Sequence, residues 1–327
     1  MKVIAYDHYG PPNVLRLKEV PKPSPKIGEL LLRVRAVEVT KADCELRSFR
    51  FPVHWFWLPL RLTMGITKPR RQVLGSYFAA EIEALGEGAS KFEVGDRIFG
   101  TAHLRLGAYG EYLCLPETYP LVTMPSNLSF EEAAAVPLGG LNALHFMRLA
   151  EIEQGESVLI NGAGGSIGIF ALQIAKDLGG HVTAVDRSIK EGMLRQIGAD
   201  HFIDYSKSDF TKSDQKYDVI FNMVARANYS AAIKCLKPGG RWLSGNPQFF
   251  HLIKPFLTNL FSDKRAITKF AGEKEEELIA LKDMIEAKRI KPVVDNVYPM
   301  EEAVLAHQRV ENEDRLGAVV LTMGRAK

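Results

Sequence analysis

The segment from Val158 to Asp186 constrains the fold of this chain more than any other, because it predicts a strand, a glycine-rich turn, a helix and a second strand in succession. Val158–Ile160 is a short apolar run, typical of a strand buried on both faces of a parallel sheet. His181–Val185 predicts the second strand, and Asp186 ends it. Between them Gly179 stands where a helix C′ residue belongs. The helix itself is indicated by apolar residues at helical spacing, namely Ile167, Phe170, Ala171, Ile174 and Leu178.

The turn in this segment has the chemistry of a phosphate site. Its glycines follow the pattern G-x-x-G-x-x-G at Gly162, Gly165 and Gly168, and Ile167 stands where the third glycine of a literal G-x-G-x-x-G belongs. Glycine lets a diphosphate approach the backbone, and a helix N-terminus offers N–H donors and partial positive charge. Asp186 lies 18 residues beyond Gly168, where an acidic residue accepts hydrogen bonds from a ribose diol. The alternative is a glycine-rich turn that binds nothing.

Composition narrows the class of protein. The chain has 327 residues, enough for two domains, with 46% hydrophobic and 25% charged residues and a net charge of +3. Because the sequence has no long run of charges of one sign, it does not resemble a nucleic-acid-binding chain. Three scattered cysteines exclude a disulfide framework and favour a reduced, cytoplasmic location. The N-terminus is not a signal peptide, and we expect no stable membrane insertion because no stretch reaches about 18 apolar residues.

The rest of the chain divides around this segment. Residues 1–124 predict short strands punctuated by Pro and Gly, with one short helix at 41–49. After a capping box at Ser129–Glu132, Pro137–Gly140 is expected to break the chain before a helix at 141–149. Strands and helices then alternate, with a turn expected at 238–240, which predicts a parallel sheet with helices on both faces. A charged helix is expected at 273–289, and the end of the chain is expected to rejoin the first domain.

Residues 49–64 contain five aromatic side chains close to two prolines and, with Arg47 just before the segment, three arginines. We expect the prolines to prevent a regular helix or a central strand here. The segment fits a lid over an apolar substrate pocket, a loop packed on the core, or a contact with another subunit, and less well a membrane-surface contact. The aromatics are Phe49, Phe51, Trp55, Phe56 and Trp57.

Seven segments carry a family resemblance when they are read in order. They are LGSYFAAEIEALGEGASKFEVGDRIFG (74–100), GAYGEYLCLPE (107–117), PSNLSFEEAAAVPLGGLNAL (125–144), VLINGAGGSIG (158–168), IGADHFIDY (197–205), LKPGG (236–240) and GAVVL (317–321). Together they resemble the medium-chain dehydrogenases/reductases, and most of all the zinc-free quinone oxidoreductase (zeta-crystallin-like) branch. The resemblance implies an α/β protein with a GroES-like β-rich catalytic domain (1–124 and 270–327), a doubly wound Rossmann domain (125–269) and a nicotinamide cofactor.

The resemblance also argues against zinc. A catalytic zinc needs three protein ligands and an open position. Zinc-dependent relatives carry Gly-His-Glu where this chain has Gly75-Ser76-Tyr77, and cysteines where it has Thr40 and, nearby, Leu138. Without a Lewis acid, the family chemistry that remains is reduction of an acceptor that is already electrophilic, a quinone or an α,β-unsaturated carbonyl compound.

The resemblance assigns residues to the site. Thr40 replaces an Asn that faces the nicotinamide, Asp43 braces the loop, and Tyr77 and Tyr109 are candidate hydroxyl donors that would equally fit core tyrosines. The implied cofactor-binding residues are Asn142, Gly162, Gly165, Ser166, Ile167, Gly168, Asp186, Arg187, Ser188, Tyr205 and Asn222.

The choice between NADPH and NADH stays open at this point. Asp186 favours NADH, whereas Arg187, Ser188 and Lys190 suit a 2′-phosphate, and the family resemblance favours NADPH. We therefore expect a zinc-free NAD(P)H-dependent reductase of a small apolar or aromatic carbonyl substrate. The alternatives are a zinc-independent alcohol dehydrogenase and a catalytically weak NAD(P)H-binding protein with a structural or regulatory role. A homodimer through an exposed sheet edge is compatible with the sequence.

Overall fold

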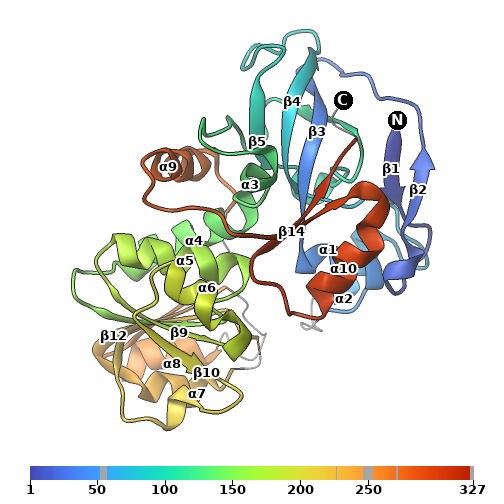
Figure 1. The fold of residues 1–327 in the computed structure, drawn as a ribbon. Helices are drawn as coiled ribbons and strands as arrows, with labels where there is room; N and C mark the ends of the chain where they lie inside the picture. Colours follow the sequence, from blue (N-terminus) through green and yellow to red (C-terminus); the bar gives the residue numbers. More distant parts are fainter. Residues whose placement is uncertain (52–56, 226, 246–252, 270–271, 325–327) are drawn as a thin grey trace. The chain divides into compact units, whose positions relative to one another are not determined.

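A computed structural model describes residues 1–51, 57–225, 227–245, 253–269 and 272–324. The chain forms two compact units. The first contains residues 1–137, 273–286 and 292–327, and the second contains residues 138–272 and 287–291. The chain ends labelled in Figure 1 therefore both belong to the first unit.

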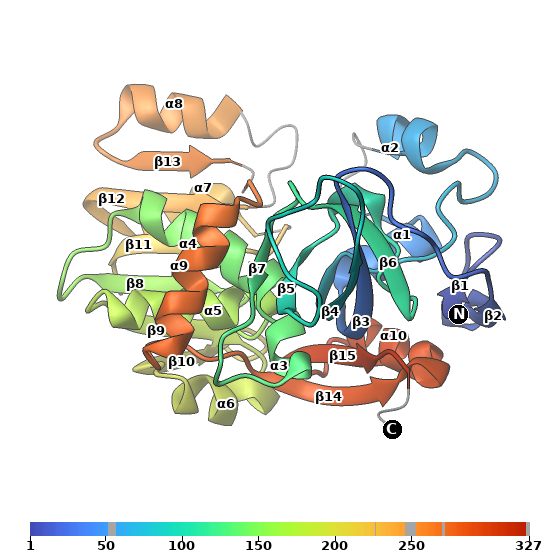
Figure 2. The ribbon, with the colours of Figure 1, turned by 90° about the horizontal axis from the view of Figure 1, so that it is seen from above.

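The second unit is built on a six-stranded parallel sheet. Its strand order is β10-β9-β8-β11-β12-β13, and Figure 2 shows the strands in this sequence. The order reverses direction between β8 and β11, the position where ligands bind in open α/β sheets. This confirms the predicted Rossmann architecture. The strands are β8 (Ser157–Asn161), β9 (His181–Asp186), β10 (His201–Asp204), β11 (Tyr217–Asn222), β12 (Leu236–Ser244) and β13 (Arg265–Thr268).

Helices cover both faces of this sheet. Figure 1 shows α5 and α6 on one face and α7 and α8 on the other. The predicted stop of α5 is confirmed, because Gly179 follows the helix with a φ of +86°. The helices are α4 (Pro137–Ala150), α5 (Ser166–Asp177), α6 (Glu191–Gln196), α7 (Tyr229–Lys234) and α8 (Ile253–Phe261).

Two local expectations in this region are wrong. Pro137 to Gly140 does not break the chain but begins α4, because a proline at the first helical position lacks only an N–H that would have had no partner in the helix. Likewise, the Pro238–Gly240 turn lies within β12. The register with β11 shifts there, and Gly239 has a φ of +71°, so the strand absorbs the irregularity instead of ending.

The first unit contains a seven-stranded sheet and a two-stranded sheet. The large sheet has the order β14-β15-β3-β4-β5-β7, with β6 paired to β3. β15 pairs with β3 through Val319 and Val39, so the end of the chain rejoins the first domain as expected. The strands are β1 (Lys2–Ala5), β2 (Arg16–Glu19), β3 (Glu29–Val39), β4 (Tyr77–Leu85), β5 (Arg97–Thr101), β6 (Tyr112–Pro116), β7 (Leu121–Thr123), β14 (Val294–Pro299) and β15 (Ala318–Thr322).

The helices of this unit begin largely as the sequence indicates. The capping box at Ser129 and Glu132 is present, and a second one joins Thr40 and Asp43. The prediction that residues 49–64 hold no regular helix is wrong, since α2 occupies their second half. Pro59 is its third residue, so it falls in the first turn, where N–H groups lack helical partners anyway. The helices are α1 (Lys41–Ser48), α2 (Trp57–Met64), α3 (Phe130–Ala134), α9 (Glu275–Glu286) and α10 (Ala303–Glu311).

The described part of the aromatic segment is packed. Phe49 is 4% exposed and meets Tyr9 and Phe51 edge to face, with ring centroids 4.8 and 5.2 Å apart. The Arg61 guanidinium lies 3.7 Å from the centre of the Phe49 ring. Phe49 therefore fits the packed-loop interpretation, whereas Trp55 and Phe56 lie outside the described residues.

No helix in the described part of the chain is long and apolar enough to cross a bilayer.

Candidate functional site

The glycine turn after β8 is shaped for close approach to a ligand. Gly162 has a φ of +88°, which favours glycine. A Cβ on Gly168 would collide with the carbonyl oxygens of Gly162 and Ala163. Gly165 caps α5, and Ser166, Ile167 and Gly168 form its first turn, whose N–H groups point out of the helix end. These residues fit a diphosphate, as the sequence predicts.

Asp186 is tied into the same turn. Its Oδ2 accepts a hydrogen bond from the Gly164 N–H at 2.7 Å, and its Oδ1 accepts one from the Arg187 N–H at 2.9 Å. Lys190 Nζ lies 3.2 Å from Oδ1 and donates to the Gly164 carbonyl at 3.3 Å. The Asp186 and Lys190 side chains are only 8% and 9% exposed, so this carboxylate has a close counter-charge. Asp186 therefore braces the turn.

The other predicted cofactor residues lie at the strand ends of this unit, with one exception. The Ser188 hydroxyl is hydrogen-bonded to the Asp204 carboxylate, and Tyr205, 55% exposed, donates its N–H to the Asp186 carbonyl. Asn222 ends β11 at the switch point. The Asn222 side-chain oxygen, Oδ1, accepts a hydrogen bond from Asn161 Nδ2 at 2.8 Å.

The exception is Asn142, which lies within α4. Its amide donates to the Leu138 carbonyl one turn earlier, at 2.9 Å.

In the first unit, Thr40 serves as a helix cap. Its hydroxyl donates to Asp43 Oδ2 at 2.6 Å and accepts from the Asp43 N–H at 3.0 Å. Asp43 also accepts from the N–H groups of Thr40 and Gly75, each at 3.0 Å. Burial raises the pKa of Asp43, and these hydrogen bonds oppose the shift. Asp43 therefore braces the loop as expected, and the Thr40 proton is already committed to it.

Tyr109 lies in a fully buried polar network. Its hydroxyl is 3.1 Å from His307 Nε2, and Arg47 Nε donates to His307 Nδ1 at 3.3 Å. Because Arg only donates, Nδ1 is an acceptor and the ring proton of neutral His307 sits on Nε2, facing Tyr109. Burial and the Arg47 charge lower the pKa of His307 to about 3. With 0% exposure, Tyr109 fits the core-tyrosine alternative.

Among the three predicted site hydroxyls, Tyr77 is the one whose residue is not fully buried. It begins β4, is partly exposed, and donates to Glu273 Oε1. Burial, together with the charge and hydrogen bond of Glu273, raises the pKa of Tyr77 well above its ordinary value, so the phenol stays protonated. Glu273 also accepts from Thr101 Oγ1 at 3.0 Å and lies 2.5 Å from His103 Nδ1.

The sequence does not reveal three of these residues. Glu273 opens a charged run that reads as the solvated start of a helix, and His307 lies in an ordinary amphipathic helix. His103 stands alone in a loop. A histidine and a glutamate that are far apart in the chain give no local sequence pattern that predicts their contact. The charged run at 273–289 indicated only a helix.

The donor set at the zinc-ligand positions does not fit a catalytic zinc. Thr40 is committed to Asp43, the Ser76 hydroxyl donates to the His103 carbonyl at 2.9 Å, and Leu138 has no donor atom. Burial raises the pKa of the nearby Cys44 to about 12, which keeps it a thiol and a poor ligand. Within the described residues, no group of three or more His, Cys, Asp or Glu is arranged to hold a metal ion.

The comparisons with known proteins agree with this architecture. Residues 26–126 match the family described as "Alcohol dehydrogenase GroES-like domain", and residues 197–321 match "Zinc-binding dehydrogenase". The chain is 30% identical to a quinone oxidoreductase of Pseudomonas aeruginosa, over 98% of this chain and 99% of that protein. It is 28% identical to a 2-methylene-furan-3-one reductase of Solanum lycopersicum, over 98% and 79% of the two chains.

A solved structure, the quinone oxidoreductase from Coxiella burnetii, is similar over 99% of both chains, with a TM-score of 0.86 and 27% identity. The fold, the ordered motifs and the full-length similarity together show that this chain belongs to the medium-chain dehydrogenase/reductase superfamily, as an oxidoreductase of the quinone oxidoreductase type.

Proposed function

We propose that this protein is a zinc-free, NAD(P)H-dependent reductase of quinones or α,β-unsaturated carbonyl compounds. The observation that carries the proposal has two parts: Thr40, Ser76 and Leu138 stand at the zinc-ligand positions, and Tyr77, which follows Ser76 in the chain, is a phenol that stays protonated. Such a site suits an acceptor that is already electrophilic and needs only positioning and a proton.

Each part of the chain has a defined task in this reaction. Bound NAD(P)H supplies the hydride. The glycine turn and the first turn of α5 hold its diphosphate, and the Asp186–Lys190 pair keeps the turn in shape. Tyr77 donates a proton to the reduced substrate, while Thr40 and Tyr109 hold the loops of the catalytic unit in place.

The test is oxidation of NADPH and of NADH, followed optically, with a small quinone and with an enone, before and after treatment with a chelator. We expect turnover that the chelator does not change. Loss of turnover after chelation would overturn the zinc-free assignment. Tight cofactor binding without turnover across the acceptors would favour the structural or regulatory role, and alcohol-dependent reduction of NAD(P)⁺ would favour a zinc-independent alcohol dehydrogenase.

We also propose that the cofactor is NADPH. Both oxygens of Asp186 accept hydrogen bonds within the turn, and Lys190 balances the carboxylate charge, so a 2′-phosphate would meet little repulsion. Arg187 follows directly, and a guanidinium suits a phosphate.

Replacing Lys190 with Met is expected to raise the Kd for NADPH by roughly tenfold and to change the Kd for NADH much less, because it leaves the Asp186 charge without its partner. Fluorescence titration of the purified protein measures both constants. Arg195→Met is the matched control, since Arg195 is paired on the surface with Glu191 one turn away. Equal weakening of both cofactors by K190M would instead indicate that Lys190 only supports the turn.

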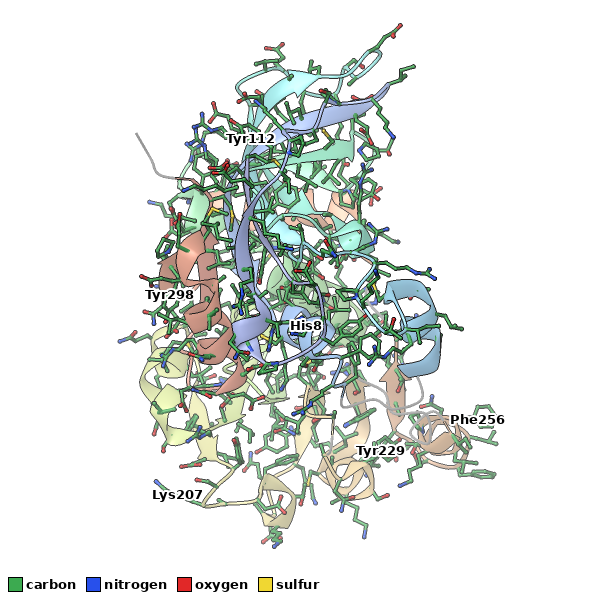
Figure 3. The ribbon with its side chains drawn as sticks, turned by 90° about the vertical axis from the view of Figure 1, so that its right-hand side faces the viewer. His8, Tyr112, Lys207, Tyr229, Phe256 and Tyr298 are labelled. Carbon is green, nitrogen blue, oxygen red and sulfur yellow. The ribbon has the colours of Figure 1, made fainter. Side chains whose placement is uncertain are left out.

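We further propose that two copies associate through the outer edge of the second unit. β13 is the end strand of the six-stranded sheet, and α8 packs beside it. The apolar side chains of α8 recur at helical spacing yet are 44% to 77% exposed, and Figure 3 shows Phe256 pointing away from the sheet. They are Ile253, Phe256, Leu257, Leu260 and Phe261.

Replacing Leu260 with Asp is expected to shift the protein from dimer to monomer, because it places a charge in the middle of this apolar face. Sedimentation velocity at micromolar concentration measures the change. Leu305→Asp is the control, since Leu305 is a single exposed leucine on α10. A wild-type protein that sediments as a monomer would contradict the proposed interface.

A further inference from the structure

Glu273 is bonded to three side chains that lie more than 160 residues before it in the sequence. Its Oε1 accepts from the Tyr77 hydroxyl, and its Oε2 accepts from Thr101 Oγ1 at 3.0 Å and lies 2.5 Å from His103 Nδ1. The Glu273 side chain is 17% exposed. Burial alone would raise its pKa, but the hydrogen bonds from His103 and Tyr77 and the His103 charge hold it below its ordinary value. Glu273 is therefore a carboxylate that links a histidine to the phenol.

His103 is held in place at some energetic cost. Its φ is +47°, a left-handed conformation that is uncommon outside glycine. Its N–H donates to Thr101 Oγ1 at 3.0 Å, and its carbonyl accepts from Ser76 at 2.9 Å. With Nδ1 directed at Glu273, the ring has Nε2 left for solvent, and the side chain is 39% exposed. Strain of this kind persists where the surrounding structure fixes a residue for a purpose.

We propose that His103 and Glu273 form a proton relay that reloads Tyr77 from solvent, and that this site is therefore built for α,β-unsaturated carbonyl substrates. The inference rests on the proposed function. Hydride adds to the β-carbon, the C=C electrons move to the carbonyl oxygen, and the resulting enolate takes the Tyr77 proton on its α-carbon. Glu273 then passes the His103 Nδ1 proton to the phenolate while water protonates Nε2, and exchange of the ring protons with water restores the Nδ1 proton before the next turnover.

The relay distinguishes the two acceptor classes. A proton on carbon transfers slowly without a positioned acid, so an enone gains from a phenol that is reloaded in every turnover. A reduced quinone needs protons only on oxygen, which water supplies quickly. The relay therefore predicts that damage to His103 or Glu273 slows enone reduction and spares quinone reduction.

The test compares Glu273→Gln and His103→Gly with wild type, using one enone and one quinone under saturating NADPH. We expect each variant to lose at least roughly tenfold in enone kcat, with quinone kcat within about twofold. His103→Gly suits the left-handed backbone and leaves a hole, so added imidazole is expected to restore enone turnover. Glu275→Gln is the control, because Glu275 lies two residues away and pairs instead with Lys91.

A second measurement needs neither cofactor nor substrate. In the cofactor-free protein, the His103 Nδ1 proton is expected to give a downfield NMR resonance that persists in E275Q and disappears in E273Q. Unchanged enone turnover in both relay variants, or an imidazole effect absent in a folded H103G, would overturn the relay while leaving the reductase intact. Equal loss with both acceptors would show a structural role for the cluster, and no turnover by wild type would instead refute the proposed function.

Discussion

Tyr77→Phe is expected to lower the enone kcat by roughly 10²–10⁴-fold, because it removes the only one of the three predicted hydroxyls that belongs to a partly exposed residue. The Tyr77 phenol is protonated and partly exposed. The buried Thr40 hydroxyl donates a hydrogen bond to Asp43, and the Tyr109 hydroxyl is fully buried against His307. Steady-state kinetics with NADPH and an enone measure the loss, and quinone kcat is expected to stay within a few-fold.

The matched variant is Tyr109→Phe. It removes a buried hydroxyl that faces His307, so the free energy of unfolding is expected to fall by about 1–3 kcal/mol while enone kcat changes only a few-fold. Chemical denaturation measures the first quantity. If Y109F abolished enone turnover in a folded protein and Y77F did not, Tyr109 would be the proton donor and Tyr77 the structural residue.

His307 is expected to make the protein sensitive to acid. Its pKa is about 3 in the folded chain and 6.5 for an ordinary histidine, so the unfolded chain binds the proton more readily between these values. The free energy of unfolding therefore falls as pH drops below about 6.5, by up to about 1.4 kcal/mol per pH unit, until about pH 3. The physical cause is burial beside the Arg47 guanidinium, because both the loss of solvent and the Arg47 charge disfavour a charged imidazolium ring.

Glu45 acts in the opposite direction. Burial raises its pKa from 4.5 to about 7, partly opposed by Lys41, so its contribution to stability is lost as pH rises through this range. Because Glu45 is partly exposed, its effect on the free energy of unfolding is smaller than that of His307.

Denaturation of wild type, His307→Gln and Glu45→Gln between pH 4.5 and 6.5 separates the contributions of His307 and Glu45. We expect E45Q to gain stability more steeply with pH than wild type, and H307Q to reverse the slope. Identical slopes in all three would contradict both assignments.

The sequence predicted the second unit well because its signals are local. The strand, glycine turn and helix around Gly162–Gly168 each follow from neighbouring residues, as does the helix cap at Ser129–Glu132 in the first unit. The errors at Pro59 and Pro137 have one cause: proline breaks a helix only in its interior, and both lie in a first turn.

The polar clusters of the first unit were harder to predict from the sequence, for a different reason. Nothing in the sequence distinguished Tyr77 from Tyr109. Only their hydrogen-bond partners in the folded chain, Glu273 for Tyr77 and His307 for Tyr109, distinguish the proposed proton donor from the buried core residue. These partners are more than 190 residues away in the chain, at separations of 196 and 198. Asp186 was recognised by position, but its bond to the Gly164 N–H depends on the folded shape of the turn.

The pairing of β15 with β3 also determines the order in which this chain can fold during synthesis. The strand beside residues 36–39 is made of residues 319–322, so the large sheet stays incomplete until residue 322 has left the ribosome. Residues 138–272, in contrast, carry all six strands of their own sheet, and the second unit is complete once residues 287–291 have also been made. The nascent catalytic unit must therefore wait with the edge of β3 open while its neighbour folds, and that interval is where a chaperone would matter most.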